Sequence, residues 1–268
     1  MSQLLTITSI HNRRIVEASK LTQRKYRESQ GRFLVDGLQL LHMALDAGLV
    51  PIEVFYCASQ FTGTEGPALV ERFAATNADL VSVSEAVIEK LSKRNAAQGI
   101  IATFALFDTT LRDRQVAGHE LVLVLDRLQD AGNVGTLIRT ADAVGVAMVA
   151  LIEPCVDVFD PKVVRASMGS LFNVPLVLTA DVPELFGWLE RGGLRLVGAD
   201  PVQGVWAMNP GGTALVLGNE ARGLSDDIRP YLREWVKLPI VGKAESLNVA
   251  VAGGVLMYTW LQANHIVG

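Results

Sequence analysis

The sequence has few of the residues and patterns that mark metal, disulfide or membrane proteins. Its 268 residues include two cysteines without a CxxC pair and four histidines that form no cluster. We therefore expect no metal site and no disulfide framework, with Cys57 and Cys155 as buried thiols. No uninterrupted run of about 18 apolar residues occurs, and residues 1–14 lack the apolar core of a signal peptide. These absences predict a soluble cytoplasmic protein without a membrane partner.

Several catalytic motifs are also missing. No GxxxxGK[ST] motif is present and no GxGxxG follows a predicted strand, which disfavours nucleoside triphosphate and dinucleotide binding. No GxSxG is present, and no histidine lies in the candidate site loops, which disfavours a serine or cysteine nucleophile. A site without a metal, a catalytic histidine or a nucleophile is typical of group transfer from an already activated donor.

The charge of the chain is mildly acidic but unevenly distributed. A net charge of −4 argues against a protein coated in nucleic acid. Between residues 13 and 32, however, seven basic residues stand against two acidic ones. Such a run is either a solvated helix face or a contact surface for phosphates, and on charge alone the solvated face is the commoner meaning.

The first part of the chain alternates short strand and helix patterns. Strand patterns lie at residues 33–35, 52–57, 80–83 and 99–105. This alternation predicts a small α/β domain over residues 1–106. Residues 107–119 are polar and form the candidate linker to a second domain.

Residues 120–268 have a different texture. Unbroken apolar runs lie at residues 121–125, 147–152, 174–178, 194–197 and 214–217. Such runs are typical of strands that are buried on both faces of a parallel sheet. Helical patterns separate them, so we expect a doubly wound parallel sheet whose ligand site lies outside the carboxyl ends of the strands.

The first candidate site segment is the predicted helix at residues 133–144. Asn133 is suited to cap this helix and Gly145 to end it. Arg139 lies amid apolar residues. It can form a surface pair with Asp142, or its guanidinium can face a phosphate or a developing oxyanion. This segment alone leaves both interpretations open.

The second segment, LGNEARGLS at residues 217–225, follows a predicted strand. Gly218 would let a ligand approach the backbone, and Gly223 permits a tight turn. Between them, Glu220 can orient a polar substrate or pair with a cation such as Arg139. The alternative is a solvated loop carboxylate, which describes most glutamates in loops.

The third segment, residues 237–260, passes from a strand end into an apolar helix. Glu245 or Ser246 can cap this helix, with Asn248 in its first turn. Three apolar residues form a wall beside them: Leu238, Ile240 and Leu247. These features are a helix cap and a core edge, or the wall and polar groups of a small-ligand pocket. Two mid-helix glycines, Gly253 and Gly254, each cost about 1 kcal/mol relative to alanine, which predicts close backbone packing.

Taken together, NVGTLIRTA (133–141), LGNEARGLS (217–225) and LPIVGKAESLNVAVAGG (238–254) resemble the three ordered motifs of the SpoU/TrmH family of RNA 2′-O-ribose methyltransferases. The resemblance implies a trefoil-knotted α/β domain over residues 120–268, with S-adenosylmethionine as cofactor and a homodimer formed through this domain. It also implies that the C-terminal helix is packed tightly in the knot and at the dimer interface, which would account for Gly253 and Gly254.

The resemblance also implies roles for single residues. The residues matching the catalytic positions of the family are Asn133, Arg139, Glu220, Ser246 and Asn248, and those matching its cofactor-binding positions are Gly218, Leu238, Ile240 and Leu247. Arg139 would stabilise the developing alkoxide of a ribose or, alternatively, act as the base. Residue 221 is alanine where many members have glycine. The family therefore implies the glutamate at residue 220 but not the detailed path of its loop.

The segment RFLVDGLQLLHMAL (32–45) resembles the substrate-binding domain of the same family, which is similar to a small ribosomal-protein fold. Members with this domain act mostly on ribosomal RNA. The resemblance therefore implies RNA contacts by residues of the basic run: Arg13, Arg14, Arg24, Lys25 and Arg27. Alternatives are a tRNA 2′-O-methyltransferase and a non-catalytic RNA-binding or ribosome assembly factor on the same fold. An α/β oxidoreductase would need the dinucleotide loop that is missing.

Overall fold

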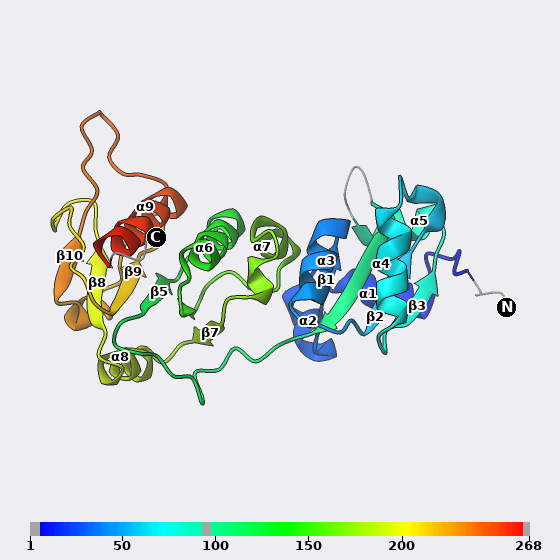
Figure 1. Cartoon of the computed structure of the whole chain (residues 1–268), viewed down its shortest axis with the longest axis horizontal. Helices are drawn as coiled ribbons and strands as arrows, with labels where there is room; N and C mark the ends of the chain where they lie inside the picture. The colour runs from blue at the N-terminus through cyan, green and yellow to red at the C-terminus, as the bar shows by residue number, and fades with distance from the viewer. Residues whose placement is uncertain (1–5, 93–97, 265–268) are drawn as a thin grey trace. The chain divides into compact units, whose positions relative to one another are not determined.

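A computed structural model describes residues 6–92 and 98–264, which form two compact units (Figure 1). The first unit contains the chain up to residue 107 together with residues 157–172, and the second contains residues 108–156 and those from 173 onward. The pattern of apolar runs in the sequence had placed residues 157–172 in the second domain. The domain boundaries at residues 106 and 120 stay predictions.

The first unit is built on a four-stranded mixed sheet with the strand order β1-β4-β2-β3. The strands are β1 (Arg32–Asp36), β2 (Glu53–Tyr56), β3 (Asp79–Ser82) and β4 (Ile100–Ala105). β4 is antiparallel to β1 and β2, whereas β2 and β3 are parallel. As a result, β1, β2 and β3 end at the same edge of the sheet.

Six α-helices of the described chain belong to this unit: α1 (Arg13–Lys20), α2 (Arg24–Gln30), α3 (Leu38–Asp46), α4 (Glu65–Ala74), α5 (Glu85–Ser92) and α7 (Pro161–Ala166). Two short 3₁₀ helices, η1 (Ala58–Gln60) and η2 (Ser170–Phe172), accompany them. The apolar residues of α1 recur three apart, at Ile15 and Ala18, and continue to Leu21 beyond the helix. They form one core with strand residues such as Phe55 because the spacing places them on one helix face.

The second unit contains six parallel strands with the order β10-β8-β9-β5-β6-β7. They are β5 (Leu121–Asp126), β6 (Met148–Ile152), β7 (Leu176–Thr179), β8 (Arg195–Ala199), β9 (Thr213–Leu217) and β10 (Glu234–Val236). β5, β6 and β9 are buried along their whole length. The predicted parallel sheet is confirmed, and its five long apolar runs are β5 to β9.

Helices cover both faces of this sheet (Figure 1). Val122 and Val124 of β5 face α8 (Val182–Arg191) and share a core with Leu185. The helices α6 (Ala131–Val144) and α9 (Val249–Ala263) lie side by side on the other face. A 3₁₀ helix, η3 (Arg229–Tyr231), precedes β10. The sheet is therefore doubly wound, as predicted.

The packing of α9 against α6 and β9 accounts for one of its two glycines. A Cβ atom at Gly253 would lie 2.5 Å from Leu137 Cδ2 and 2.5 Å from Leu217 Cδ1, so only glycine fits without movement. A Cβ atom at Gly254 would meet Thr140 Cγ2 at 3.7 Å, an ordinary contact. The predicted close backbone approach is confirmed for Gly253 and is absent at Gly254 within the described chain.

Two predicted helix starts are wrong by a few residues. α6 begins earlier than expected, because Asp130 is its cap and accepts from the backbone N of Asn133 at 2.7 Å. α9 begins later, because Asn248 is the cap and its Oδ1 accepts from Ala250 N at 2.9 Å. Asp130 has an extended backbone, and both caps have side chains that suit this position.

Candidate active site

Three segments that are far apart in the sequence meet through one chain of hydrogen bonds. Asn248, at the start of α9, donates from Nδ2 to Asn133 Oδ1 at 2.9 Å. Asn133, in the first turn of α6, donates from Nδ2 to Glu220 Oε1 at 3.2 Å. Glu220 lies in the loop of residues 218–227 that follows β9, here named the glutamate loop. The structure therefore brings together three of the five predicted catalytic residues.

The direction of these hydrogen bonds is fixed by the start of α9. Asn248 Oδ1 accepts from Ala250 N at 2.9 Å and Val251 N at 3.3 Å, so only its NH₂ group can face Asn133. Asn133 must then accept with Oδ1, and its own NH₂ group faces Glu220. An asparagine cap on one helix thereby sets which atoms are donors throughout the cluster.

Glu220 accepts every hydrogen bond that it makes in this cluster. Its Oε1 accepts from Asp130 N at 3.3 Å and from Asn133 Nδ2, and its Oε2 accepts from Gln129 N at 3.4 Å. Backbone N–H groups at a helix start favour a negatively charged partner. Glu220 therefore binds the start of α6 as a carboxylate and links it to the glutamate loop.

The glutamate loop is held in shape by its own backbone. Asn219 and Gly223 exchange two backbone hydrogen bonds, of 3.0 and 2.8 Å. Gly223 has φ = 68°, in agreement with the predicted tight turn. A Cβ atom at Gly218 would lie 2.3 Å from the carbonyl carbon of Gly223. The glycine at 218 is therefore required by the folding of the loop itself, whatever ligand also approaches it.

A charged cluster that the sequence analysis missed joins this loop to the end of β5. The buried Asp126 accepts with Oδ2 from the backbone N and the Oγ of Ser225, both at 2.7 Å. The Arg127 guanidinium donates to Asp126 Oδ1 at 2.8 Å and to Asp227 Oδ2 at 2.7 Å. The hydrogen bond from Arg127 lowers the pKa of Asp227, and the hydrogen bond to Asp227 raises the pKa of Arg127. The signal that could have indicated this cluster is an Asp-Arg pair at the end of an unbroken apolar run.

Arg139 and Ser246 lie outside the hydrogen-bonded cluster. Arg139 is exposed on α6, and it has no hydrogen bond or ion pair with any other residue of the described ranges. Its expected surface partner, Asp142, accepts from Asn173 Nδ2 at 3.1 Å instead. Six helix positions separate Arg139 from Asn133, which turns it by about 120° around the axis. Ser246 is exposed in the loop before Asn248.

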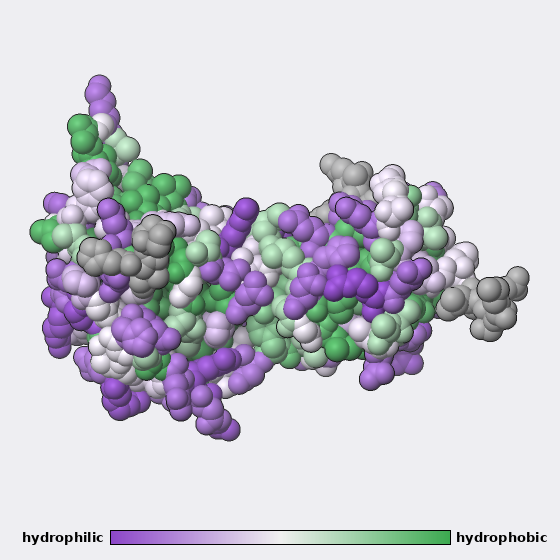
Figure 2. Space-filling view, in the orientation of Figure 1, coloured by the Kyte–Doolittle hydropathy of each residue, from purple (hydrophilic) through white to green (hydrophobic). Residues whose placement is uncertain are grey.

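The predicted cofactor wall lies in the same loop region. Leu238 and Ile240 are half-buried after β10, and Leu247 is exposed beside Asn248. Figure 2 shows that apolar side chains reach the surface over α9 and the loop that leads to it. The loop that leads to Asn248 therefore carries accessible apolar surface.

The predicted RNA contacts of the first unit differ in their exposure. Arg27 is 2% exposed and donates to Asp157 Oδ2 from Nε at 2.9 Å and from Nη2 at 2.6 Å. Arg14 donates from Nε to Glu53 at 2.9 Å and also binds Asp79. Arg24 pairs with Glu28 on α2. Arg13 and Lys25 are exposed, and the Lys25 Nζ lies 4.7 Å from the centre of the Tyr26 ring.

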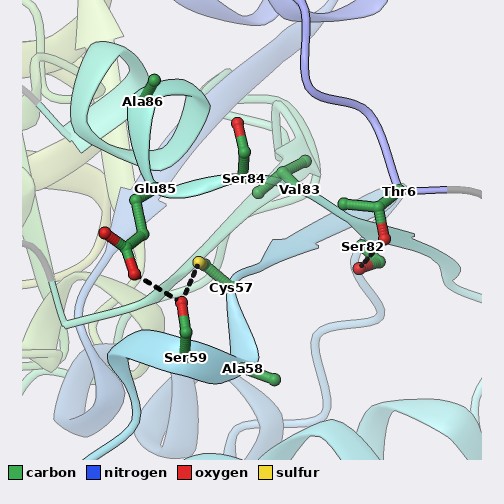
Figure 3. Close-up of a pocket in the computed structure, with 9 residues that line it drawn as sticks. All are labelled: Thr6, Cys57, Ala58, Ser59, Ser82, Val83, Ser84, Glu85 and Ala86. Carbon is green, nitrogen blue, oxygen red and sulfur yellow. Dashed lines mark hydrogen bonds between the residues drawn. The ribbon is translucent and has the colours of Figure 1, made fainter.

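A separate hollow of about 510 Å³ lies in the first unit, at the carboxyl ends of β2 and β3 (Figure 3). Ser59 donates from Oγ to Glu85 at 2.7 Å and lies 3.3 Å from the Sγ of Cys57. None of the residues predicted for catalysis, cofactor or RNA lines this hollow.

Within ranges 6–92 and 98–264, no three His, Cys, Asp or Glu side chains are grouped so that they could hold a metal ion. No helix in this part of the chain has the length and apolar character needed to cross a membrane.

Comparison with known proteins gives two family matches. Residues 120–258 match the model of the SpoU rRNA Methylase family, and residues 12–102 match an MRM3-like substrate binding domain. A tRNA/rRNA methyltransferase of Synechocystis is 34% identical over 96% of this chain and 93% of that protein. RlmP of Bacillus subtilis, a 23S rRNA guanosine 2′-O-methyltransferase, is 30% identical over 94% of this chain and 97% of its own length.

The solved structures give the same result. An AdoMet-bound rRNA methyltransferase from Sinorhizobium meliloti superposes with a TM-score of 0.88 at 28% identity, and the match covers 100% of both chains. Together with the all-parallel sheet and the smaller mixed sheet, this likeness confirms the fold class expected from the sequence.

Proposed function

The chain belongs to the SpoU rRNA methylase family, and on this premise we propose that it transfers a methyl group from S-adenosylmethionine to the 2′-hydroxyl of a ribose in ribosomal RNA. The observation that supports this function is the chain of hydrogen bonds from Glu220 through Asn133 to Asn248. These contacts join residues of all three motifs beyond the carboxyl edge of the parallel sheet, where doubly wound folds bind ligands.

The residues that match the cofactor-binding motifs have a chemistry that fits the proposed cofactor. Leu238, Ile240 and Leu247 present accessible apolar surface, which suits the adenosyl group, and Gly218 offers backbone groups. S-adenosylmethionine supplies a methyl group that is already activated by its sulfonium. The protein therefore has to position the sugar hydroxyl and stabilise its developing charge, without a metal or a covalent intermediate.

Each polar residue has a defined part in this proposal. Arg139 stabilises the negative charge that develops at the ribose 2′-oxygen as the hydroxyl proton passes to water, because a guanidinium is a planar cation with several donors. Asn248 and Ser246 orient the ribose and the cofactor. Asn133 and Glu220 keep these groups in place through the start of α6.

The proposal includes a homodimer formed through the second unit. Leu247, which precedes the cap of α9, and three residues along one face of the helix remain 42–54% exposed: Val251, Val255 and Tyr258. A second copy of this face would cover them. Val255→Asp places a charge in the middle of this face, so it should yield monomers in sedimentation velocity runs in which the wild type sediments as a dimer. A wild-type monomer at micromolar concentration would contradict the dimer.

Two findings support ribosomal RNA as the substrate. The relative RlmP is a 23S rRNA methyltransferase, and residues 12–102 match an MRM3-like substrate binding domain. This substrate implies that the enzyme works in the compartment of the ribosome, the cytoplasm. The test is a map of ribose methylation in ribosomal and transfer RNA from cells with and without the protein. A site that is lost only from ribosomal RNA supports the proposal, and one lost from transfer RNA redirects it.

Cofactor binding separates the enzyme from a non-catalytic factor on the same fold. Isothermal titration of the purified protein with S-adenosylmethionine should show saturable binding. A protein that binds ribosomal RNA but no S-adenosylmethionine would be an assembly factor, and the enzymatic proposal would be wrong.

A further inference from the structure

Arg127 has a backbone conformation that needs support from its surroundings. It follows β5 directly and has φ = 56°, in the left-handed region that residues other than glycine rarely adopt. Such strain persists where neighbouring contacts fix the residue, and it is often found near functional sites. The contacts of Arg127 therefore indicate what the conformation is for.

The guanidinium of Arg127 holds the C-terminal end of the glutamate loop. Its Nη1 and Nη2 bind the two carboxylate oxygens of Asp227, at 3.2 and 2.7 Å, in a two-point contact. Nη1 also donates to Ser225 Oγ and to Asp126 Oδ1. Ser225 is bound in turn by the buried Asp126, so this end of the loop is fixed to the end of β5.

The carbonyl group of Arg127 holds the N-terminal end of the same loop. Its oxygen accepts from Asn219 Nδ2 at 2.8 Å, next to Glu220. The Oδ1 of Asn219 then accepts from the backbone N of Ala221 at 3.0 Å, inside the turn. The left-handed φ of Arg127 orients this carbonyl, so one residue binds the loop on both sides of Glu220.

We infer that Arg127 is a positioning residue for the proposed methyl transfer, acting through Glu220 on Asn133 and Asn248. It touches neither cofactor nor RNA in this assignment. Without the guanidinium, the loop is free to move, and Glu220 no longer keeps its place against Gln129 N and Asp130 N. The orientation of the two asparagines is then lost as well. This inference rests on the proposed function, because the effect is expected in turnover.

The test compares Arg127→Met with Arg195→Met. Arg195 also binds a carboxylate and a hydroxyl, Glu234 Oε2 at 2.8 Å and Thr213 Oγ1 at 3.0 Å, but it lies at the amino end of β8. In single-turnover methyl transfer, Arg127→Met should lower the rate about 10- to 100-fold with a nearly unchanged KM for RNA. Arg195→Met should stay within about twofold of the wild type, although both variants lose an ion pair.

Amide hydrogen exchange provides a readout that does not need turnover. The amides of Asn219 and Gly223, which bond to each other across the turn, should exchange at least about tenfold faster in Arg127→Met and unchanged in Arg195→Met. Arg127→Lys, which keeps the charge without the two-point contact, should recover part of both effects.

The possible outcomes are distinct. Arg127→Met with wild-type rate and wild-type exchange at these amides would overturn the inference. If this variant does not fold, Arg127→Lys carries the same test, and wild-type values in both measurements overturn the inference equally. An inactive wild type in the methylation assay would count against the proposed function instead, while the exchange measurement would still test the effect of Arg127 on the loop.

Discussion

Asn248 donates from Nδ2 to Asn133 Oδ1 at 2.9 Å, although 115 positions separate the two residues in the sequence. The same Asn248 uses its oxygen to cap α9. One side chain thus fixes the start of the C-terminal helix and the hydrogen-bond direction of the candidate site. These two tasks can be separated by substitution.

Asn248→Asp should keep the fold and lose methyl transfer. Aspartate caps helices as well as asparagine, so the free energy of unfolding should change by no more than about 0.5 kcal/mol. Its second oxygen, however, would face Asn133 Oδ1, and a flipped Asn133 would turn its oxygen toward Glu220. Asn248→Ala should lose activity and also about 1 kcal/mol of stability. Urea unfolding and a methylation assay on both variants check this, and an active Asn248→Asp enzyme would contradict it.

Arg139→Ala should abolish methyl transfer and leave the affinity for S-adenosylmethionine nearly unchanged. Arg139 is exposed and has no partner in the part of the chain that the structure describes, so thermal stability should also be preserved, within about 0.5 kcal/mol. Arg139→Lys tests whether the planar set of guanidinium donors is needed, because the ammonium group of lysine cannot reproduce it. Calorimetric titration and single-turnover assays are the measurements, and retained turnover in Arg139→Ala would remove this residue from its role.

Gly253→Ala should destabilise the second unit, whereas Gly254→Ala should not. The added methyl group at residue 253 would lie 2.5 Å from both Leu137 Cδ2 and Leu217 Cδ1. Such overpacking costs about 1–3 kcal/mol. At residue 254 the nearest atom is 3.7 Å away, and alanine is the better helix former by about 1 kcal/mol. Urea unfolding of the two variants provides the comparison, and equal stability loss in both would show that the close contact at Gly253 is not the cause.

Patterns that depend on near neighbours in sequence predicted most of the second unit. The five apolar runs are strands β5 to β9, Gly145 ends α6 with φ = 76°, and Gly223 forms the turn of the glutamate loop. These features follow from local burial and from backbone freedom at glycine. The sequence did not show which residue caps each helix. Asp130 and Asn133 are both good caps for α6, and Ser246 and Asn248 are both good caps for α9.

The sequence could not show which side chains contact each other across long separations in the chain. The link from Asn133 to Glu220 spans 87 positions, and the motif resemblance grouped these residues without giving their contacts. The Asp126 and Arg127 cluster was missed because its partners Ser225 and Asp227 follow a different strand. In the basic run, the sequence did not distinguish the buried Arg27 from its exposed neighbours, because its partner Asp157 lies 130 positions away.

Acidification should weaken the attachment of the glutamate loop. Arg127 lowers the pKa of Asp227, so the ion pair contributes stability at neutral pH. That contribution is complete above the unfolded pKa, about 3.9, and is lost as the pH falls through the lowered folded value. The difference in unfolding free energy between wild type and Asp227→Asn should therefore shrink as the pH is lowered from 7 to 3. A difference that stays constant over this range would show that the pair does not contribute.

The basic run of the first unit should divide into structural and RNA-binding residues. Arg27 is 2% exposed and binds both Asp157 and the carbonyl of Leu21, so Arg27→Ala leaves a carboxylate without its partner. Breaking a buried pair in this way costs about 3–5 kcal/mol. Arg13 and Lys25 are exposed, so Arg13→Ala and Lys25→Ala should leave stability within about 0.5 kcal/mol of the wild type.

The same two exposed residues should govern the salt dependence of RNA binding. Each phosphate contact that is removed lowers the slope of log affinity against log salt by about one, so Arg13→Ala and Lys25→Ala should each reduce the slope by that amount. Arg27→Ala should leave the slope unchanged in the fraction that remains folded, because its guanidinium is bound by Asp157 and Leu21. Urea unfolding and filter binding at 50–300 mM salt, on the order of the physiological range, give both quantities. A stable Arg27→Ala protein with a reduced slope would show instead that Arg27 contacts RNA, as the family resemblance implies.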